Sequence, residues 1–268
     1  MSDAELKRYV RAATNAAFEA GKLLLKHAGC PAQVETKRSP IDLVTEIDKA
    51  AENLIRRRLA RAFPDFGFLG EEHGAAQEDA EYRWIIDPID GTMNFVHGIP
   101  LFGISIGLER RGRLIAGVIF DPSRRELYTA TRGGGAFLNG KRIHVSCVKR
   151  LDFSVLSTGF SSKFRQQPEP YLTWFKTFEM RCHAVRRIGT TVLALAYVAS
   201  GRMEGFYEQD LWPWDVAAGI VIVEEAGGRV TNFDGKAPGL ERGKLVASNG
   251  KIHRAILDTL QETSAFNS

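Results

Sequence analysis

The sequence predicts an α/β protein of the α+β type, folded as a layered sandwich. Residues 1–63 carry apolar side chains at helical spacing, which indicates two helices. From there to about residue 130, short apolar stretches separated by turn signals indicate a meander of strands, and after about Val155 strand-like and helix-like stretches alternate. Helices, a meander and then alternating elements together favour stacked layers of helix and sheet.

The two helices at the start are predicted from their apolar stripes. The first ends near Gly29, and the second begins after Thr45, which can cap it, and ends at Phe63, because Pro64 follows. The stripe positions are Leu6, Val10, Ala13, Ala17, Leu24 and Leu25 in the first helix and Ile47, Ala51, Leu54, Ile55 and Leu59 in the second. The arginines expected to point away from the core are Arg56, Arg57 and Arg61.

Strands dominate the next part of the chain. The expected strands are residues 66–69, 82–86, 103–108, 114–120 and 126–130. Arg111-Gly112, Asp121-Pro122 and Asn139-Gly140 are turn signals between or after them. Neighbouring strands joined by such short turns run antiparallel, so this half of the protein is expected to be a largely antiparallel meander.

The second half is predicted to alternate strands and helices. Helices are expected at residues 190–200 and 215–226, and strands at 206–207 and near residues 229 and 245. No repeat, low-complexity tract or clear linker interrupts the chain. We therefore expect one unit, residues 1–268, with a soft subdivision into a metal-binding half (1–150) and an α/β half (151–268).

Composition and charge are those of an ordinary globular protein. The 268 residues are 44% hydrophobic and 25% charged, with a net charge of +4. Basic residues are scattered among 32 acidic ones, so nucleic-acid binding gains little support and an anionic small substrate fits equally well. The three cysteines form no CxxC pair, and no apolar run is long enough to span a bilayer, so a soluble, unexported and cytoplasmic protein is expected.

The run from Trp84 to Thr92 is the most informative stretch. Three apolar residues of strand character deliver Asp87 and Asp90 into a turn, with Pro88 fixing the backbone between them and Gly91 free to adopt unusual conformations. Both carboxylates and an intervening carbonyl can then converge on one cation, and hard oxygen ligands favour magnesium. A plain turn is the alternative, since Asp, Pro and Gly are ordinary turn residues.

Further acidic residues also lie at predicted element ends. Asp42 and Asp48 flank a strand-to-helix junction, Glu71 and Glu72 follow a strand, and Asp215 opens a helix. Each has a structural explanation as well, because acidic residues cap helix N-termini and are favoured there by the helix dipole.

Four strings carry a resemblance to a known family. They are DLVTEID (42–48), GEE (70–72), WIIDPIDGT (84–92) and WDVAAGIVIVEEAGG (214–228). In order, spacing and context they resemble the inositol monophosphatase family, from about residue 37 to residue 228. The resemblance implies an αβαβα layered sandwich and magnesium-dependent, lithium-sensitive hydrolysis of small phosphate monoesters. A homodimer is also expected.

The resemblance implies two or three magnesium ions in the site. The first would be held by Glu71, Asp87 and the carbonyl of Ile89, and the second by Asp87, Asp90 and Asp215, while a third, weaker ion would use Glu71 and waters. Phosphate monoesters are dianions, so a site made of carboxylates needs cations to offset both charges.

The nucleophile implied by the resemblance is a water molecule on the first metal ion. Because this water attacks the phosphate directly, no phosphoenzyme forms. Thr92 and Asp48 resemble the pair that orients this water and takes its proton, with Glu71 also part of the catalytic set. The backbone N–H groups of Gly91 and Thr92 would receive the phosphate oxygens if a helical turn begins there.

The resemblance is less specific for the residues that would contact the hydroxyl groups of the substrate. Backbone amides near Thr191 and the carboxylate of Glu208, which is expected to follow a strand, resemble the hydroxyl-binding wall of the family, and Asp215 is counted with them. Ser161 falls near another polar contact of the family, although its local string departs from the eukaryotic pattern. Lys37 resembles a loop lysine near the third ion, or is an ordinary solvated charge.

The leading hypothesis is hydrolysis of myo-inositol monophosphate to inositol and phosphate. The alternatives are a phosphatase of fructose 1,6-bisphosphate, histidinol phosphate or 3′-phosphoadenosine 5′-phosphate, since the metal motifs are shared. A different alternative is a protein that binds RNA or a transcription complex through basic residues, with incidental phosphatase activity; these residues are Arg56, Arg57, Arg58, Arg186 and Arg187.

Overall fold

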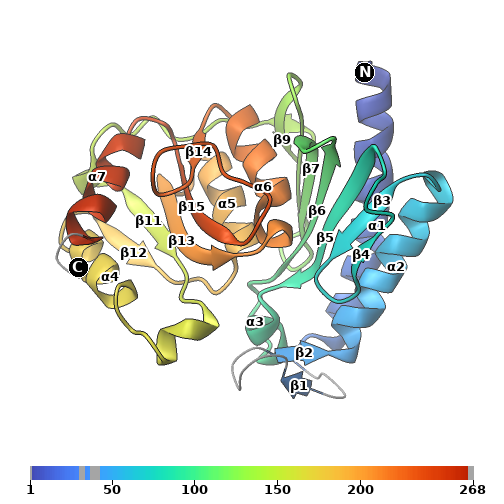
Figure 1. The fold of residues 1–268 in the computed structure, drawn as a ribbon, viewed down its shortest axis with the longest axis horizontal. Helices are drawn as coiled ribbons and strands as arrows, with labels where there is room; N and C mark the ends of the chain where they lie inside the picture. The colour runs from blue at the N-terminus through green and yellow to red at the C-terminus, as the bar shows by residue number, and fades with distance from the viewer. Residues whose placement is uncertain (1, 30–33, 37–42, 265–268) are drawn as a thin grey trace.

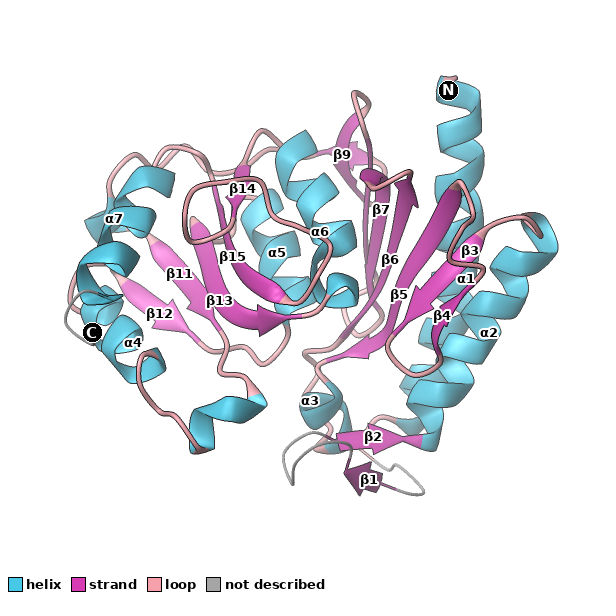
Figure 2. Cartoon of the chain, in the orientation of Figure 1, coloured by secondary structure: helices cyan, strands magenta, loops and turns pink. Residues whose placement is uncertain are grey.

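The computed structural model describes residues 2–29, 34–36 and 43–264, which stack as helix, sheet, helix, sheet and helix layers (Figures 1 and 2). The predicted αβαβα sandwich is therefore confirmed. A small two-stranded sheet, β1 (Val34–Thr36) with β2 (Leu43–Thr45), lies apart from the layers.

The larger sheet has the strand order β10-β9-β8-β7-β6-β5-β3-β4 in the described residues. Its strands are β3 (Gly67–Gly70), β4 (Gly74–Ala76), β5 (Tyr82–Asp90), β6 (Gly103–Arg110), β7 (Arg113–Asp121), β8 (Glu126–Thr131), β9 (Gly135–Leu138) and β10 (Lys141–Arg142). All neighbours from β5 to β10 pair antiparallel, whereas β3 runs parallel to β5. The predicted meander is confirmed. Its turns at Arg111-Gly112 and Asn139-Gly140 have positive φ at both residues, which suits tight hairpins.

The smaller sheet has the order β12-β11-β13-β15-β14. Its strands are β11 (Val155–Thr158), β12 (Ala184–Arg186), β13 (Gly205–Leu211), β14 (Arg229–Thr231) and β15 (Gly243–Ser248). The larger sheet thus ends at Arg142 and the smaller one begins at Val155, while the division of the chain into two halves stays a prediction.

Helices cover both sheets (Figure 1). They are α1 (Asp3–His27), α2 (Glu46–Ala62), α3 (Thr92–Val96), α4 (Tyr171–Glu179), α5 (Thr191–Ala199), α6 (Pro213–Glu225) and α7 (His253–Ser264), with 3₁₀ turns η1 (Leu151–Phe153) and η2 (Ser162–Arg165). One buried cluster joins α1 and α2 to the larger sheet, a second surrounds α5 and α6 between the sheets, and a third joins α4 and α7 to the smaller sheet. None of the described helices has both the length and the apolar character needed to cross a bilayer.

Helix α6 packs unusually close to the larger sheet. A Cβ atom on Gly117 would lie 2.5 Å from the carbonyl oxygen of Ala218, and one on Gly107 would lie 2.8 Å from the Cβ of Ala217. Two glycines facing two alanines therefore let the helix backbone approach the strands, which brings its N-terminus and Asp215 toward the end of β5.

Several local expectations were wrong. Leu25 is 50% exposed beside the buried Leu24, because neighbouring residues on a helix point about 100° apart and Leu25 lies beyond the edge of the buried face. Arg56 does not point away from the core: it lies over the ring of Phe68 and pairs with the buried Glu52. The sequence analysis also missed helices α4 and α7 and the parallel pairing of β3 with β5.

Candidate active site

A cavity of about 690 Å³ collects most of the predicted site residues. Its lining comes from both halves of the chain. From the first half come Glu71, Asp90, Met93 and Asn94, and from the second Thr158, Gly159, Phe160, Ser161, Ser162, Phe164, Arg165, Arg187, Gly189, Thr190, Thr191, Phe206, Glu208, Gln209, Asp210, Leu211, Trp212, Trp214, Asp215 and Arg242. The cavity therefore has an acidic side next to β5 and an aromatic and basic side next to β13.

The motif around Asp87 lies inside strand β5 rather than in a turn after it. The strand continues to Asp90, and its pairing with β6 shifts between Asp87 and Asp90. A bulge is one of the few places where a sheet accepts proline, and it redirects the side chains on either side. Asp87 is 1% exposed, and its Oδ1 accepts the N–H of Ile89 at 3.0 Å. The bulge explains how both aspartates come from one strand.

Asp90 is a buried carboxylate held by the start of helix α5. Its Oδ2 accepts a hydrogen bond from the Thr190 hydroxyl and another, 2.6 Å long, from the N–H of Val192. Burial, together with the charge of Glu71, raises the pKa of Asp90 to about 6 although both hydrogen bonds oppose the rise. The carboxylate is thus fixed in place in a site that disfavours its negative charge.

Asp215 opens helix α6 on the same cavity. Its Oδ2 accepts the N–H of Trp212 at 2.7 Å, which fixes the side chain at the helix N-terminus as expected. Burial and the charges of Asp90 and Glu71 raise the pKa of Asp215 well above its ordinary value. These three acidic groups therefore destabilise one another, which is typical of a site arranged for a cation.

The acidic groups alone do not complete a metal cage. Within the described residues, no three carboxylate, imidazole or thiol side chains stand close enough together to hold one ion. Magnesium usually keeps several waters and takes only one or two protein carboxylates, so this arrangement agrees with a site completed by water, phosphate or a carbonyl such as that of Ile89.

Thr92 and Asp48 meet as the sequence analysis predicted. The Thr92 hydroxyl lies 3.1 Å from Asp48 Oδ1 and 3.0 Å from the carbonyl oxygen of Ile89, so it can donate to either. Asp48 is fully buried, and Gly91, with φ of +91°, is the residue before helix α3, which begins at Thr92. The predicted helical turn at Gly91 and Thr92 is confirmed.

Glu208 lies within β13 and does not follow it, so that expectation was wrong: the strand continues through a bulge to Leu211. The Thr191 hydroxyl donates to Glu208 Oε2 at 3.2 Å, so these two residues, expected to belong to one wall, are in contact. Burial and the charge of Asp90 raise the pKa of Glu208 to about 8. A Cβ on Gly159 would lie 2.2 Å from Glu208 Oε1, so only glycine lets this wall approach the carboxylate.

Ser161 is present in the cavity lining but already has partners. Its hydroxyl lies 2.6 Å from the hydroxyl of Tyr171 and donates to Asp210 Oδ2 at 3.0 Å. Lys37 and Asp42 lie outside the described residues. Two residues of the cavity were not among the predicted site residues: Thr190, whose hydroxyl donates to Asp90, and Asp210, which accepts from Ser161.

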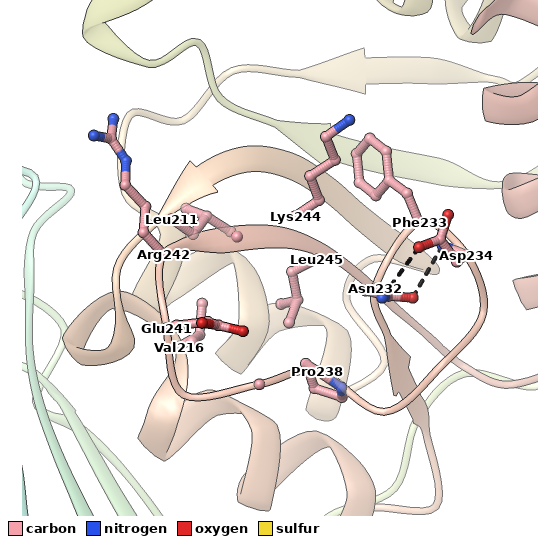
Figure 3. Close-up of a pocket in the computed structure, with 12 residues that line it drawn as sticks. Leu211, Val216, Asn232, Phe233, Asp234, Pro238, Glu241, Arg242, Lys244 and Leu245 are labelled. Carbon is pink, nitrogen blue, oxygen red and sulfur yellow. Dashed lines mark hydrogen bonds between the residues drawn. The ribbon is translucent and has the colours of Figure 1, made fainter.

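A smaller cavity of about 260 Å³ lies beside the segment from Asn232 to Lys244 (Figure 3). Its charged lining residues Asp234, Glu241, Arg242 and Lys244 are exposed, and Asn232 interacts with the neighbouring Asp234. Six of the predicted site residues line the larger cavity, which we therefore take as the candidate active site: Glu71, Asp90, Ser161, Thr191, Glu208 and Asp215. The other predicted residues that the structure describes, Asp48, Asp87, Ile89, Gly91 and Thr92, are not part of this lining.

Comparison with known proteins agrees with this assignment. The model of the inositol monophosphatase family matches residues 5–265. Inositol-1-monophosphatase of Mesorhizobium japonicum is 43% identical over 249 residues, 92% of this chain and 94% of that protein. Nus factor SuhB of Pseudomonas aeruginosa is 45% identical over 225 residues, 82% and 83% of the two chains. The structure of inositol monophosphatase from Anabaena (Nostoc) sp. PCC 7120 superposes with a TM-score of 0.88 at 37% identity, covering 96% of this chain and 97% of that one.

The fold and the acidic cavity, together with these matches, define a phosphoric monoester hydrolase. The chain belongs to the inositol monophosphatase family.

Proposed function

We propose that this protein hydrolyses the phosphate ester of a small polyol, with myo-inositol monophosphate as the first candidate. The observation that carries the proposal is the convergence of Glu71, Asp90 and Asp215 on one cavity that Glu208 also lines. The first three suit a cation-assisted phosphate site, whereas a carboxylate across the cavity suits hydroxyl groups. The name of the Mesorhizobium japonicum relative supports the choice of inositol.

Magnesium fits the acidic side of the cavity. The donors are hard oxygens, and the raised pKa values of Asp90 and Asp215 indicate charges that a cation would neutralise. We assign Glu71, Asp87 and the Ile89 carbonyl to one ion and Asp87, Asp90 and Asp215 to a second, with a third ion on Glu71. Because no three such side chains of the described residues stand close enough together to hold one ion, the three carboxylates of the second site would have to move closer when the ion binds. Bound there, magnesium would offset the charge of the phosphate and lower the pKa of the hydrolytic water.

The protein's own part in hydrolysis is to orient the water and take its proton. Asp48 is buried and accepts a hydrogen bond from Thr92, so a water bonded to the Thr92 oxygen can pass its proton through the hydroxyl to the carboxylate. The N–H groups of Gly91 and Thr92 are assigned to phosphate oxygens, since α3 begins there.

The alcohol part of the substrate is assigned to the wall formed by Glu208 and Thr191. Glu208 can accept hydrogen bonds from hydroxyl groups, and its hydrogen bond from Thr191 holds it toward the cavity. Ser161 is assigned a supporting place in this wall because its hydroxyl is already bonded to Asp210.

The decisive experiment is a phosphate-release screen over a panel of phosphomonoesters, with and without magnesium. We expect the highest kcat/KM with inositol monophosphate, no turnover in excess chelator, inhibition by lithium and little activity with calcium, whose looser coordination misplaces the reacting groups. Undiminished turnover in chelator would contradict the metal assignment. A higher kcat/KM with fructose 1,6-bisphosphate, histidinol phosphate or 3′-phosphoadenosine 5′-phosphate would contradict the choice of inositol monophosphate as the substrate.

A second candidate role, binding RNA or a transcription complex, takes its support from relatives named Nus factor SuhB. The arginines that favoured it are partly engaged within the protein: Arg56 pairs with Glu52, Arg58 with Glu19, and Arg187 lies over Phe160. A salt titration of RNA binding tests this role, since a phosphate-tracking surface loses affinity steeply as salt rises. Homodimerisation and a cytoplasmic location also stay predictions; light scattering after gel filtration tests the former.

A further inference from the structure

Asp210 has a backbone conformation that residues with side chains rarely adopt. Its φ is +65°, and it is the extra residue where the pairing of β13 with β15 shifts between Gln209 and Leu211. Glycine is the usual residue at such a bulge, and aspartate is among the few residues with a side chain that also adopt this conformation. The role of Asp210 is therefore inferred from its side-chain contacts.

The carboxylate of Asp210 gathers three donors from a segment far away in the sequence. Oδ2 accepts hydrogen bonds from Ser161 at 3.0 Å and from Tyr171 at 3.1 Å, and Oδ1 accepts one from Lys163 at 2.8 Å. Burial would raise the pKa of Asp210, but the three hydrogen bonds together hold it below its ordinary value. Asp210 is thus an anionic anchor for this segment.

The anchored segment, residues 159–165, forms the wall of the cavity opposite the acidic side. The rings of Phe160 and Phe164 lie 4.5 Å apart, and the ring of Tyr171 lies 5.5 Å from Phe160. Gly159, at the start of the segment, touches the carboxylate of Glu208. Phe160 and Phe164 both line the cavity, so the position of this segment determines its shape.

Glu208 and Asp210 belong to the same strand, β13. Glu208 lines the cavity directly, whereas Asp210 ties the opposite wall to the strand that carries Glu208. The separation between wall and carboxylate, and hence the space for the alcohol part of a substrate, therefore depends on the Asp210 contacts.

We propose that Asp210 is a positioning residue that determines specificity: it holds residues 159–165 against β13 and so sets the fit of the substrate's alcohol group. This inference rests on the proposed function in placing a polyol beside Glu208. It assigns Asp210 no contact with the phosphate or with the reacting atoms.

The test uses Asp210→Gly, Asp210→Asn and a matched control, Asn139→Gly. Glycine adopts φ of +65° without strain, so Asp210→Gly keeps the bulge and removes the side-chain contacts of Asp210, namely the anchor and the ion pair with Arg242 at 3.6 Å. Asn139 also has positive φ, +49°, and its side chain bonds Leu127 and Arg125 in a hairpin away from the cavity. The control thus makes the same kind of change elsewhere.

Two measurements are made on each variant. We expect Asp210→Gly to raise the KM for inositol monophosphate about tenfold, with kcat within about threefold and inhibition by inorganic phosphate unchanged, because only the alcohol side loses its position. Asp210→Asn should show a smaller rise, since its amide oxygen can still accept from Ser161 and Tyr171. Amide hydrogen exchange at Phe164 and Gln166, which bond within the anchored segment, should become at least about tenfold faster in Asp210→Gly.

An unchanged KM and unchanged exchange in Asp210→Gly would overturn the proposal, as would an equal loss in Asn139→Gly or a parallel loss of phosphate inhibition. Exchange needs no turnover, so it tests the anchor even if the parent protein does not hydrolyse inositol monophosphate. In that case the proposed substrate fails, and the KM comparison is made with the phosphomonoester that the screen identifies.

Discussion

The two sides of the cavity are built in opposite ways. The acidic side comes mainly from one short stretch, Asp87 to Thr92, joined by Glu71 and Asp215 at the ends of neighbouring elements. The opposite side is assembled from separate segments around residues 159–165, 187–191 and 208–212. One side is thus specified locally in the sequence, and the other only by the packing of the second sheet.

The charges on the two sides differ in the same way. Burial and mutual repulsion raise the pKa values of Asp90 and Asp215, so the site disfavours their negative charges. Asp210, on the other side, pairs with Lys163 and accepts from two hydroxyl groups, and its pKa is lowered, whereas the pKa of Glu208 on the same side is raised to about 8. The acidic side is therefore suited to a cation brought from solution, whereas the opposite side combines a neutralised carboxylate, Asp210, with Glu208, which lines the cavity and suits hydrogen bonding.

The largest expected effect is on the acidic side. Asp90→Asn and Asp215→Asn should each reduce kcat by a factor on the order of 10³ or more, because each removes a ligand assigned to the same metal ion. The double variant should be about as slow as either single one. A double variant slower by the product of the two losses would place the residues in separate sites.

The same substitutions test the electrostatic contrast directly. Because the folded state holds Asp90 at a raised pKa, its charge destabilises the fold at pH 8, and Asp90→Asn should raise the thermal unfolding temperature in metal-free buffer. Asp210→Asn should lower it, since that charge is paired. A lower unfolding temperature in both variants would show that the charge of Asp90 does not destabilise the fold.

Thr92→Ala should have the next largest effect. Loss of the hydroxyl should lower kcat by about a hundredfold, because the pair with Asp48 is assigned to proton transfer. The magnesium concentration for half-maximal activity should stay within about twofold, measured by a metal titration at saturating substrate. A large rise in that concentration would move Thr92 from the water to the metal.

Glu208→Ala tests the opposite side. The variant should raise the KM for inositol monophosphate roughly ten- to a hundredfold, which corresponds to losing about 1 to 3 kcal/mol when the hydrogen-bonding partner of the substrate is removed. An aryl phosphate without hydroxyl groups should be spared, because it makes no hydrogen bond to Glu208 and Glu208 is assigned no contact with the metals. Equal losses on both substrates would make Glu208 a structural residue.

Much of the fold was predictable because its signals are local. Hairpin turns at Arg111-Gly112 and Asn139-Gly140 and the apolar stripes of α1 and α2 follow from neighbouring residues. The parallel pairing of β3 with β5 was missed, since nothing within either strand encodes a distant partner. Helices α4 and α7 cover the outer face of the second sheet and were also missed.

The site residues also differ in whether their signals are local in the sequence. The strings around Asp87 and Asp215 indicated the acidic side, and the structure brings Glu71, Asp90 and Asp215 to one cavity and Thr92 to Asp48. The place of Glu208 inside β13, and the Asp210 anchor, depend on a bulge between paired strands. A bulge is a property of the pairing, so neither strand alone reveals it.

The smallest expected effect concerns a buried histidine in the second half. His253 is 1% exposed between the hydroxyl groups of Thr231 and Ser248, each 2.9 Å from a ring nitrogen. Burial, aided by the charge of Arg229, lowers the pKa of His253 from 6.5 to about 4. Between these pH values the unfolded chain binds a proton that the folded protein does not, so the free energy of unfolding should fall as pH is lowered from 6.5 to 4.

Glu208, whose pKa is raised to about 8, has the opposite effect: the free energy of unfolding should fall as pH rises from 4.5 to 8. Denaturant unfolding at several pH values should therefore show a smaller loss of stability between pH 6.5 and 4 in His253→Gln than in the parent, and a smaller loss between pH 4.5 and 8 in Glu208→Gln. Identical slopes in the parent and His253→Gln would show that the imidazole takes up its proton without opening the second sheet.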